Sequence, residues 1–431
     1  MSRRPGPARL PRTLGVLGLA PLLVLVACTS GEEATTPGGE QDQGTEVPEP
    51  VELGLAGAVE DHLRAVSDLG ADLVAEAGQD TLVVSPAGLA TTLAMLGAGA
   101  GGATRGEIED LLGADVDATL EAIQALRAAR SDLDQDPAMI ELDPLPDHAI
   151  LHLANQVVLA EGTEPHQAWS DTVTGRLGTE VVTAGEDELQ QVLDDWVNLH
   201  TAGLVEESGI DADQDTLLVV QDALLVASAW LTNFSESSTS EEDFTLPGGD
   251  VVRVPTMHAE RPQAYAEVDG HQVVAFDLLD GLDLAVLLPA EGTAPTQVTA
   301  EQWSSVSDAL AEGEQPIVEL ALPRADVETS LDLMPLLGTL GAAELVGGSP
   351  DLGGILEEDL VVDQAVQQAR LQVGEEGVVA AAVTEIGGTG SAQPPPERVE
   401  MTVDRPYALR IVDQDGWVLL HGVIGDPRGE A

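Results

Sequence analysis

The sequence contains no lysine, and positive charge is scarce in it. All 17 basic side chains are arginines, against 76 aspartates and glutamates, so the formal net charge is −59. A chain without a basic patch cannot neutralise a phosphate backbone, which excludes nucleic-acid binding. Self-repulsion of this size destabilises a compact chain at low salt and is screened at high salt. The acid excess is typical of a halophilic exported protein, whereas a high-GC genome would explain only the missing lysine.

Cysteine is nearly absent as well, because Cys28 is the only one and no intramolecular disulfide can form. It stands just after an apolar run from Leu14 to Val26. That run is too short and wrongly flanked for a membrane span, and it predicts a secretory signal. The basic residues expected ahead of such a signal are four arginines: Arg3, Arg4, Arg9 and Arg12.

The end of this signal, Leu25-Val26-Ala27-Cys28, resembles a bacterial lipobox, in which the cysteine is lipidated and becomes the mature N-terminus. We therefore expect residues 1–27 to be removed and Cys28 to anchor the protein to the outer face of the bacterial cell membrane. The alternative is an ordinary signal with an incidental cysteine, and Arg3-Arg4 leaves the export route open. Loss of four arginines and no acid takes the net charge to −59 − 4 = −63. Residues 28–50 predict a flexible acidic tether.

No arrangement of residues indicates an enzyme. The motifs H-E-x-x-H and G-x-S-x-G are absent, the eight histidines are scattered, and carboxylates are too frequent for any pair of them to be informative. The run Gly97 to Gly102 satisfies G-x-G-x-x-G, but an amphipathic helix precedes it where a dinucleotide fold needs a strand. We therefore expect no catalytic residues, no metal and no cofactor.

The stretch from Gly374 to Pro396 combines two features that are seldom joined. Val378 to Val383 is small, apolar and uncharged, as a β-strand would be, whereas Gly387 to Ala392 is rich in Gly, Ser and Thr and predicts an exposed, easily cleaved segment. Strand-like runs flank the stretch, Gln368 to Val373 and Arg398 to Val403. A strand-former left exposed is unusual, because such segments are normally covered or blunted by charge. On local sequence alone, a long surface loop is the alternative.

The remaining chain mixes helical and strand patterns, which predicts an α+β protein. Ser85-Pro86 is a favoured helix start and precedes a predicted helix from Ala87 to Ala98. We expect a further helix from Leu189 to Leu204. Leu217 to Trp230 predicts a strand buried on both faces, at the centre of a large sheet. Its single charge, Asp222, needs a partner or a raised pKa there.

Motifs along the chain, from Val51 almost to the C-terminus, resemble the serpins. The run from Glu375 to Thr384 matches the hinge and alanine run of the family's reactive-centre loop, except that Val378 replaces a hydroxyl residue. Ser85 to Leu89 resembles the family's Ser-Pro-x-Ser-Ile, with Gly88 in place of the second serine. The resemblance implies a serpin domain over residues 51–428, with three β-sheets, eight or nine helices and an exposed loop at 375–396. The hinge residues it implies are Glu375, Glu376, Gly377, Val378, Val379, Ala380, Ala381 and Ala382.

The resemblance also implies a region that controls opening of the central sheet. In serpins an Asn there bonds a His on a neighbouring strand; the corresponding residues are Asp222 and Gln367, which can still form hydrogen bonds. Ser85 belongs to the same region. Trp230 corresponds to the tryptophan at the mouth where the loop enters the sheet.

What the resemblance implies for function is suicide inhibition of a serine protease. Cleavage is expected between Ser391 and Ala392, with Thr389 or Gly390 as alternatives for the register, and the small residues there favour elastase-like or subtilisin-like targets. The freed strand, held out of the sheet until then, would insert and form a covalent acyl complex with the protease. Glycosaminoglycan cofactors are excluded by the missing basic helix, and we expect a monomer. A non-inhibitory serpin acting as a binding or structural surface lipoprotein is the alternative.

Overall fold

The computed structural model describes residues 55–213, 215–313, 315–378 and 398–429. The chain divides into two units, residues 1–49 and residues 50–431. The first unit lies outside the described residues, and with it the predicted signal, Cys28 and most of the tether. Every described residue belongs to the second unit.

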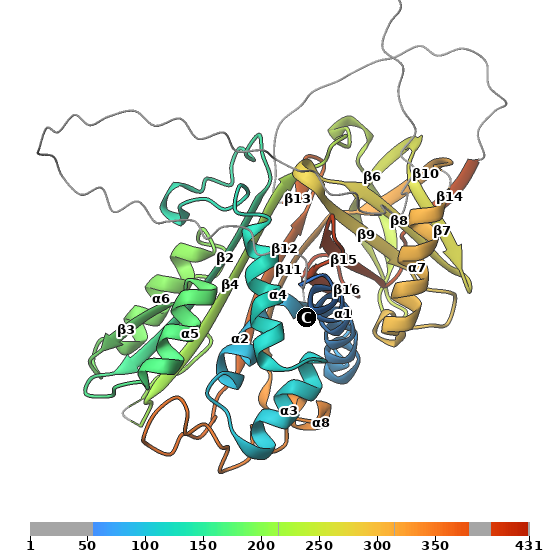
Figure 1. The fold of residues 1–431 in the computed structure, drawn as a ribbon. Helices are drawn as coiled ribbons and strands as arrows, with labels where there is room; N and C mark the ends of the chain where they lie inside the picture. Colours follow the sequence, from blue (N-terminus) through green and yellow to red (C-terminus); the bar gives the residue numbers. More distant parts are fainter. Residues whose placement is uncertain (1–54, 214, 314, 379–397, 430–431) are drawn as a thin grey trace, which may run out of the picture. The chain divides into compact units, whose positions relative to one another are not determined.

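A six-stranded sheet, which we call the central sheet, contains the residues that the sequence predicts to be functional (Figure 1). Its order is β11-β12-β13-β4-β2-β3, with β2 and β3 parallel and all other neighbours antiparallel. The strands in that order are Ala325–Asp332, Val366–Val373, Gly377–Val378, Leu218–Ala229, Ile150–Ala160 and Glu180–Ala184. The predicted long apolar strand is β4, which lies inside the sheet as expected.

Two further sheets complete the strand architecture of the described residues. The first, in the order β1-β16-β15-β9-β8-β7, contains Leu82–Val84, Val418–Ile424, Tyr407–Asp413, Leu282–Leu288, His271–Asp277 and Ala264–Val268. The second, in the order β14-β10-β6-β5, contains Arg398–Thr402, Ile317–Pro323, Val251–Pro262 and Ser240–Thr245. β14 is the first described element after the predicted reactive loop, and it pairs in parallel with β10.

Eight α-helices lie within the described ranges, and together with three sheets they confirm the predicted α+β architecture. None of them is both long and apolar enough to cross a membrane. The helices α1 to α8 are Leu55–Ala77, Pro86–Gly97, Gly102–Leu112, Val116–Ala128, Gln167–Leu177, Leu189–His200, Ala300–Glu312 and Met334–Leu340. The glycine-rich run after Pro86–Gly97 forms the turn between α2 and α3.

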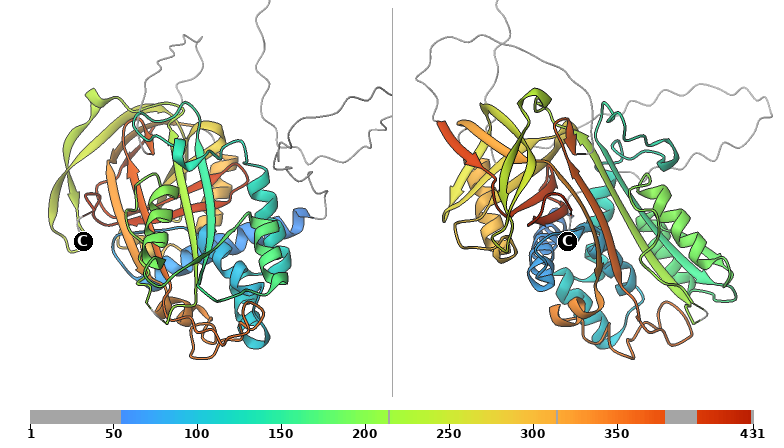
Figure 2. Two further views of the ribbon diagram at one scale, coloured as in Figure 1. Left: turned by 90° about the vertical axis from the view of Figure 1, so that its left-hand side faces the viewer. Right: turned by 180° about the vertical axis from the view of Figure 1, so that it is seen from behind.

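Helices cover both faces of the central sheet (Figures 1 and 2). On the inner face α2 packs against β4 and β16, and its side chains belong to the main hydrophobic core. Ser85 caps this helix by accepting a hydrogen bond from the backbone N–H of Gly88 at 3.0 Å, and Pro86 occupies its first turn. On the outer face α6 packs on β2 and β4 over a smaller core that includes Leu189, Leu193 and Val219.

The predicted helix from Leu189 to Leu204 is four residues too long, because α6 ends at His200. Ala202 and Gly203 have φ angles of 50° and 78°, which a right-handed helix cannot contain. The Thr201 hydroxyl donates to the carbonyl of Val197 at 2.7 Å and accepts from the N–H of Val205 at 3.1 Å. A side chain thus replaces the next helical hydrogen bonds and turns the chain back toward the sheet.

Candidate functional site in the central sheet

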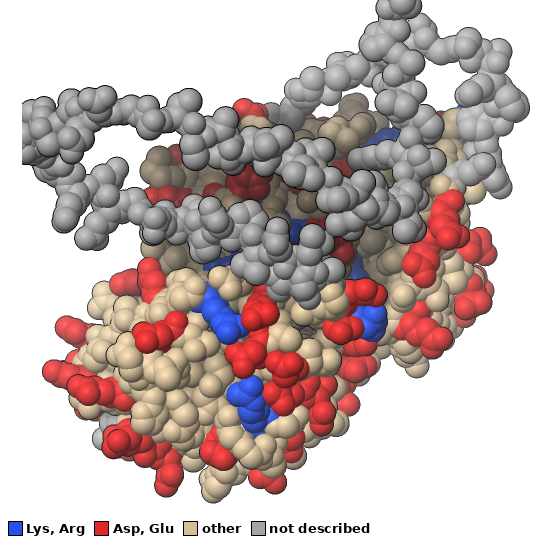
Figure 3. Space-filling model, in the orientation of Figure 1, with Lys and Arg blue, Asp and Glu red and all other residues tan. Residues whose placement is uncertain are grey.

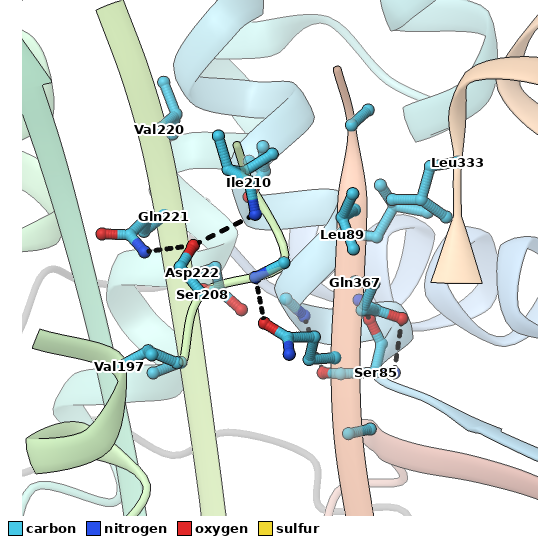
Figure 4. Close-up of a pocket in the computed structure, with 18 of the residues that line it drawn as sticks. Ser85, Leu89, Val197, Ser208, Ile210, Val220, Gln221, Asp222, Leu333 and Gln367 are labelled. Atoms are coloured by element: carbon cyan, nitrogen blue, oxygen red, sulfur yellow. Dashed lines mark hydrogen bonds between the residues drawn. The ribbon is translucent and has the colours of Figure 1, made fainter. Parts of the chain in front are cut away.

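Strands β4 and β12 are separated by a gap in which only two of the described residues, Gly377 and Val378, lie as a strand. Val378 of β13 pairs with Val373 on one side and Ser228 on the other, and no other described residue pairs with both strands. Below this point the facing edges, residues 218–227 of β4 and 366–372 of β12, have no described strand between them. We call this gap the slot. A cavity of about 220 Å³ lies in it, lined by both strands and α2 (Figure 4).

The head of the slot is closed by the first part of the predicted hinge. The backbone N–H of Trp230 donates to Glu376 O at 3.0 Å, and that of Phe234 donates to Glu375 O at 2.8 Å. The Trp230 indole also donates to Gly374 O at 2.8 Å. Val378 is 1% exposed and belongs to the main core. The expectation that the strand from Val378 onward is held out of the sheet is therefore wrong for Val378; its apolar side chain is already buried there.

Glu375 is fixed by an ion pair at the same place. Its carboxylate Oε1 accepts from Arg324 Nε at 2.9 Å, from Arg324 Nη2 at 2.5 Å and from Thr239 Oγ1 at 2.5 Å. Burial acts to raise the pKa of Glu375, but these hydrogen bonds outweigh it and hold the pKa below its ordinary value. The sequence resemblance pointed to Glu375 but not to Arg324, which follows β10.

Asp222 lines the inner side of the slot and is hydrogen-bonded to a neighbouring strand. Its Oδ2 accepts from Asn155 Nδ2 of β2 at 2.6 Å, and Asn155 Oδ1 in turn accepts from Arg127 Nη1 of α4 at 2.7 Å. Burial raises the pKa of Asp222 to about 6, with Arg127 and Asn155 acting in the opposite direction. Both outcomes expected for a lone charge in this strand, a partner and a raised pKa, are present.

The glycine at position 88 is what makes room for this carboxylate. A Cβ on Gly88 would lie 2.1 Å from Asp222 Oδ1, closer than any side-chain contact allows. The two departures from the serpin pattern, Gly88 for serine and Asp222 for asparagine, are thus spatial neighbours. The Asp222 side chain occupies the space that a side chain at position 88 would need, so with this conformation of Asp222 only glycine fits there.

Gln367 lies on the opposite wall and does not bond to Asp222. Its side-chain amide accepts from the Ser85 N–H at 3.0 Å and donates to the Ser85 carbonyl at 2.9 Å (Figure 4). The family pair that is expected to bond across the sheet is therefore split here. One member is bound to β2, and the other is bound to the start of α2.

A segment that follows α6, residues 207–211, crosses the outer face of the slot. Gln368 of β12 accepts from Gly209 N at 2.6 Å and donates to Glu207 O at 3.1 Å, while Gln221 of β4 donates to Ser208 Oγ at 3.4 Å (Figure 4). Neutral amides on both walls are therefore tied to one segment. The two walls are bridged on the outer face by this segment and on the inner face by α2.

The other predicted site residues lie outside the described residues: Val379, Ala380, Ala381 and Ala382 of the hinge, the bond between Ser391 and Ala392, and Cys28. Among the described residues, no three His, Cys, Asp or Glu side chains are grouped to hold a metal ion. The residues that sequence reasoning missed are Arg127, Asn155 and Arg324. The one signal available in the sequence was the scarcity of arginine, because in a chain with so few arginines a buried one is seldom incidental.

Comparisons with known proteins agree with the fold. The family described as "Serpin (serine protease inhibitor)" matches residues 64–427. The chain is 24% identical over 353 residues to alpha-1-antiproteinase of Mus saxicola, covering 79% of this chain and 82% of that one. It is also 24% identical over 353 residues to corticosteroid-binding globulin of Ovis aries, covering 80% and 79%. A solved Arabidopsis serpin in its native stressed conformation superposes with a TM-score of 0.73 at 20% identity, over 88% of this chain and 100% of that one.

Because the match extends over most of its length, this chain belongs to the serpin family. The family is described by protease inhibition, and the relatives compared are named as inhibitors or binding globulins and not as enzymes. A relative named as a binding globulin shows that the fold also serves binding.

Proposed function

We propose that this protein inhibits serine proteases by suicide cleavage of its reactive loop followed by insertion of the loop into the central sheet. The observation that supports this most directly is the slot: below Val378 the two facing strand edges have no partner among the described residues, and Val378 itself already lies between them. Unpaired edges leave backbone donors and acceptors without partners, and a strand placed there would satisfy both rows. Each hydrogen bond so formed contributes about 1 kcal/mol.

The chemical steps of this proposal follow from the position of the loop. The protease serine attacks the carbonyl carbon of Ser391, the bond to the nitrogen of Ala392 breaks, and Ala392 leaves as a free amine. The protease remains esterified to Ser391. Residues 379–391 are then released at one end and enter the slot behind Val378, and the attached protease is carried along and distorted before water can hydrolyse the ester. Insertion is favourable because it fills the sheet.

The sequence of the loop fits this route in size and charge. From Val379 to Thr384 it contains no charge, no proline and nothing larger than valine or threonine. A buried unpaired charge would oppose insertion by several kcal/mol. Small uncharged residues around the bond, from Thr389 to Ala392, fit the primary pockets of elastase-like and subtilisin-like proteases and not those of trypsin-like ones.

We further propose that lipidated Cys28 anchors the inhibitor, as a monomer, to the outer face of a bacterial cell membrane. The sole cysteine at the end of a signal-like run supports this. Residues 29–50 would then hold the inhibitor domain away from the lipid surface. Palmitate labelling of the wild type but not of a Cys28→Ala variant is the expected result.

A single gel experiment tests the inhibitory mechanism. The mature protein, equilibrated at high salt to screen its charge, is incubated with pancreatic elastase and with subtilisin and then denatured in SDS. We expect a band at the combined mass of inhibitor and protease that survives boiling. Cleaved protein with no such band at any ratio of the two proteins would contradict the proposal.

The substitution Ser391→Arg tests the position of the cleaved bond. It should shift complex formation from elastase toward trypsin, because trypsin-like enzymes bind a cationic side chain in the primary pocket. Thr389→Arg provides the matched control, which should remain an elastase inhibitor. If Thr389→Arg and not Ser391→Arg changes the target, the bond lies nearer the hinge.

The second candidate function is binding without inhibition, as a carrier or structural surface lipoprotein. The relationship to a corticosteroid-binding globulin favours it. It predicts ordinary cleavage in the gel experiment, with no covalent complex for any protease.

A further inference from the structure

We propose that His152 and His200 form an acid-sensitive switch on the outer face of the central sheet. Protonation of both rings separates the end of α6 from the sheet and frees the segment of residues 207–211, which bridges the two walls of the slot. The inference goes beyond the proposed function and does not depend on it, because the release is measured without a protease.

The two rings meet where α6 packs on β2. His152 Nε2 and His200 Nδ1 are 2.8 Å apart, and the ring planes are within 7° of parallel. His152 is 5% exposed, and its other nitrogen, Nδ1, lies 2.6 Å from Asp134 Oδ1 in the chain between α4 and β2. Because an ionised carboxylate can only accept, His152 Nδ1 carries a hydrogen and donates it to Asp134.

The space between the two rings has room for one hydrogen. In the neutral pair it belongs to His200 Nδ1 and points at the lone pair of His152 Nε2. A first proton can be held on His152, beside Asp134, and the contact survives because the hydrogen of His200 moves to its other nitrogen. A second proton places N–H groups on both sides of the 2.8 Å distance and puts two like charges together. The doubly protonated pair must therefore separate.

The energetics of His200 agree with this geometry. Burial, and then the charge of His152, lower the pKa of His200 to about 4, and Asp134 acts in the opposite direction. With His200 released into water its pKa returns to about 6.5, so the released form binds the proton more tightly. By linkage, the released form is favoured about 50-fold more at pH 4.5 than at pH 7.

Other titratable groups lie on the elements packed against α6, which are β2, β4 and the short helix η1, Pro137–Met139. β2 contributes His152 alone, β4 contributes Asp222, and η1 is capped by Asp136. α6 itself carries Asp194 and Asp195. Asp222 also changes its charge between pH 4 and 6, so a test of the pair must hold Asp222 constant and vary the histidines.

The end of α6 packs in a small core of its own. The buried members of that core are Trp196, Val197, Val205 and Ala223, and they are separate from the main core of the protein. The Trp196 ring lies 4.5 Å from the His200 ring between centroids. A unit with few buried apolar contacts opens at a lower free energy than the whole protein. Loss of the histidine contact can therefore open this unit while the main core stays intact.

The segment of residues 207–211 is bonded to α6 and would move with it. Asp194 Oδ1 of α6 accepts from the N–H of Ser208 at 2.9 Å. Just beyond the segment, Gln190 Oε1 of α6 accepts from the N–H of Ala212 at 3.0 Å. A shift of α6 away from the sheet is thus transmitted to the backbone of the segment.

On its other side the same segment is bonded to the β12 wall of the slot. Gln368 holds the backbone of residues 207 and 209, and Gln364 both accepts from the N–H of Asp211 at 3.0 Å and donates to its carbonyl at 2.8 Å. These contacts depend on where α6 holds the segment (Figure 4). In acid the two walls would lose their outer bridge and keep the inner one, which is α2.

Hydrogen exchange of the full mature protein tests the switch at fixed high salt and at pH 7, 5.5 and 4.5, with labelling times corrected for the intrinsic rate. We expect the protection of residues 201–211 to fall about 10-fold or more from pH 7 to 4.5 in the wild type. The protection of β15, in another sheet, should not fall in parallel. In His200→Gln, whose amide can donate to His152 but cannot titrate, the fall should be absent.

His148→Gln is the matched control, because that ring is 81% exposed, and it should behave as the wild type. If His200→Gln does not fold, His152→Gln serves instead: the fall should be smaller than in the wild type, because the opposing charge is gone while the burial of His200 remains. A fall of equal size in the wild type and the histidine variants, no fall in the wild type, or a parallel loss of protection in β15 would overturn the switch.

Discussion

The ion pair between Glu375 and Arg324 holds the start of the loop more strongly than the contacts of the adjacent hinge residues do. Glu375 is 6% exposed and accepts three hydrogen bonds through one oxygen. These hydrogen bonds, and not water, therefore stabilise the charge of its carboxylate. Arg324 keeps nearly half of its side chain in solvent, which weakens the pair relative to a fully buried one. The contact is nevertheless the only charged connection between hinge and body among the described residues.

Arg324→Ala is expected to lower the melting temperature of the uncut protein by about 2–5 °C, because it leaves the buried Glu375 carboxylate with Thr239 alone. Arg253→Ala is the control, since its pair with Asp243 has both side chains largely exposed and should contribute less than about 1 kcal/mol. Equal melting temperatures for the two variants would contradict a role for Arg324 in fixing the hinge.

Asp222 gives the uncut protein an unusual pH dependence. Its pKa is about 6 in the fold and near 3.9 in the unfolded chain, so the native state retains a proton between those values that the unfolded state has lost. The contribution of Asp222 to stability therefore falls as pH rises from 4 to 6 and is then constant. Asp222→Asn keeps an acceptor for Asn155 and removes this cost. It should stabilise the protein by about 1–3 kcal/mol at pH 8, with the difference vanishing near pH 4.

This prediction is checked by denaturation of wild type and Asp222→Asn at pH 4.5, 6 and 8. A difference independent of pH would show that the carboxylate is not the source.

Gly88→Ser, which restores the family residue, should be destabilising in the wild type and tolerated only together with a smaller residue at position 222.

Sequence patterns anticipated Asp222 but not its partners. A lone acid in an apolar strand must be satisfied, and that could be stated from the sequence. That Asn155 and Arg127 would satisfy it depends on the register of β2 against β4 and on the packing of α4, which no local pattern encodes. Gln367 was likewise matched with Asp222 from the sequence, yet it bonds the backbone of Ser85 on the other wall of the slot.

At the scale of elements, α6 is held to the central sheet by a pair of histidines. His152 of β2 and His200 of α6 approach at 2.8 Å between Nε2 and Nδ1, with Asp134 at 2.6 Å from the other nitrogen of His152. Trp196 packs on the His200 ring. Burial, and then the field of His152, lower the pKa of His200 to about 4, with Asp134 opposing.

The unfolded state takes up a proton on His200 near pH 6.5 and the fold does so only near pH 4, so stability falls as pH drops through that window. Between pH 7.5 and 4.5 the wild type should lose about 2–4 °C of melting temperature relative to His200→Gln. His148→Gln is the control, because that ring is 81% exposed, and it should follow the wild type. Parallel curves for wild type and His200→Gln would refute the role of the pair.

Elements that local sequence patterns specify could be predicted from the sequence. Element ends and positions that depend on competing interactions could not. Ser85-Pro86 located α2, and the apolar run of β4 located the middle of the sheet. The end of α6 was misplaced because Thr201 takes over the next hydrogen bonds with its side chain. The sequence-based prediction wrongly placed Val378 outside the sheet. Its position depends on the balance between burying one valine and keeping the loop free, and the sequence does not reveal that balance.

On the scale of the whole molecule, acidic side chains are spread among uncharged residues over the visible face and outnumber the few arginines there (Figure 3). With a net charge of −59, self-repulsion acts on every form of the chain, and salt screens it. The slot is chemically different from that surface: amides and apolar side chains make up most of its lining, and its charged residues are Asp222, Asp363 and Arg370. An uncharged strand can therefore enter a largely uncharged slot in an acidic protein, and melting experiments should be run at fixed high salt.

The central claim is that the sheet is incomplete in the intact protein and is completed by the loop. It is tested most directly by cutting the loop once, between residues 387 and 392, and comparing the melting temperatures of the intact and cut forms. If a strand fills the slot, the cut protein should melt at least about 10 °C higher, because hydrogen bonds form along both walls and each adds about 1 kcal/mol. A cut form that melts at or below the intact protein would contradict the account.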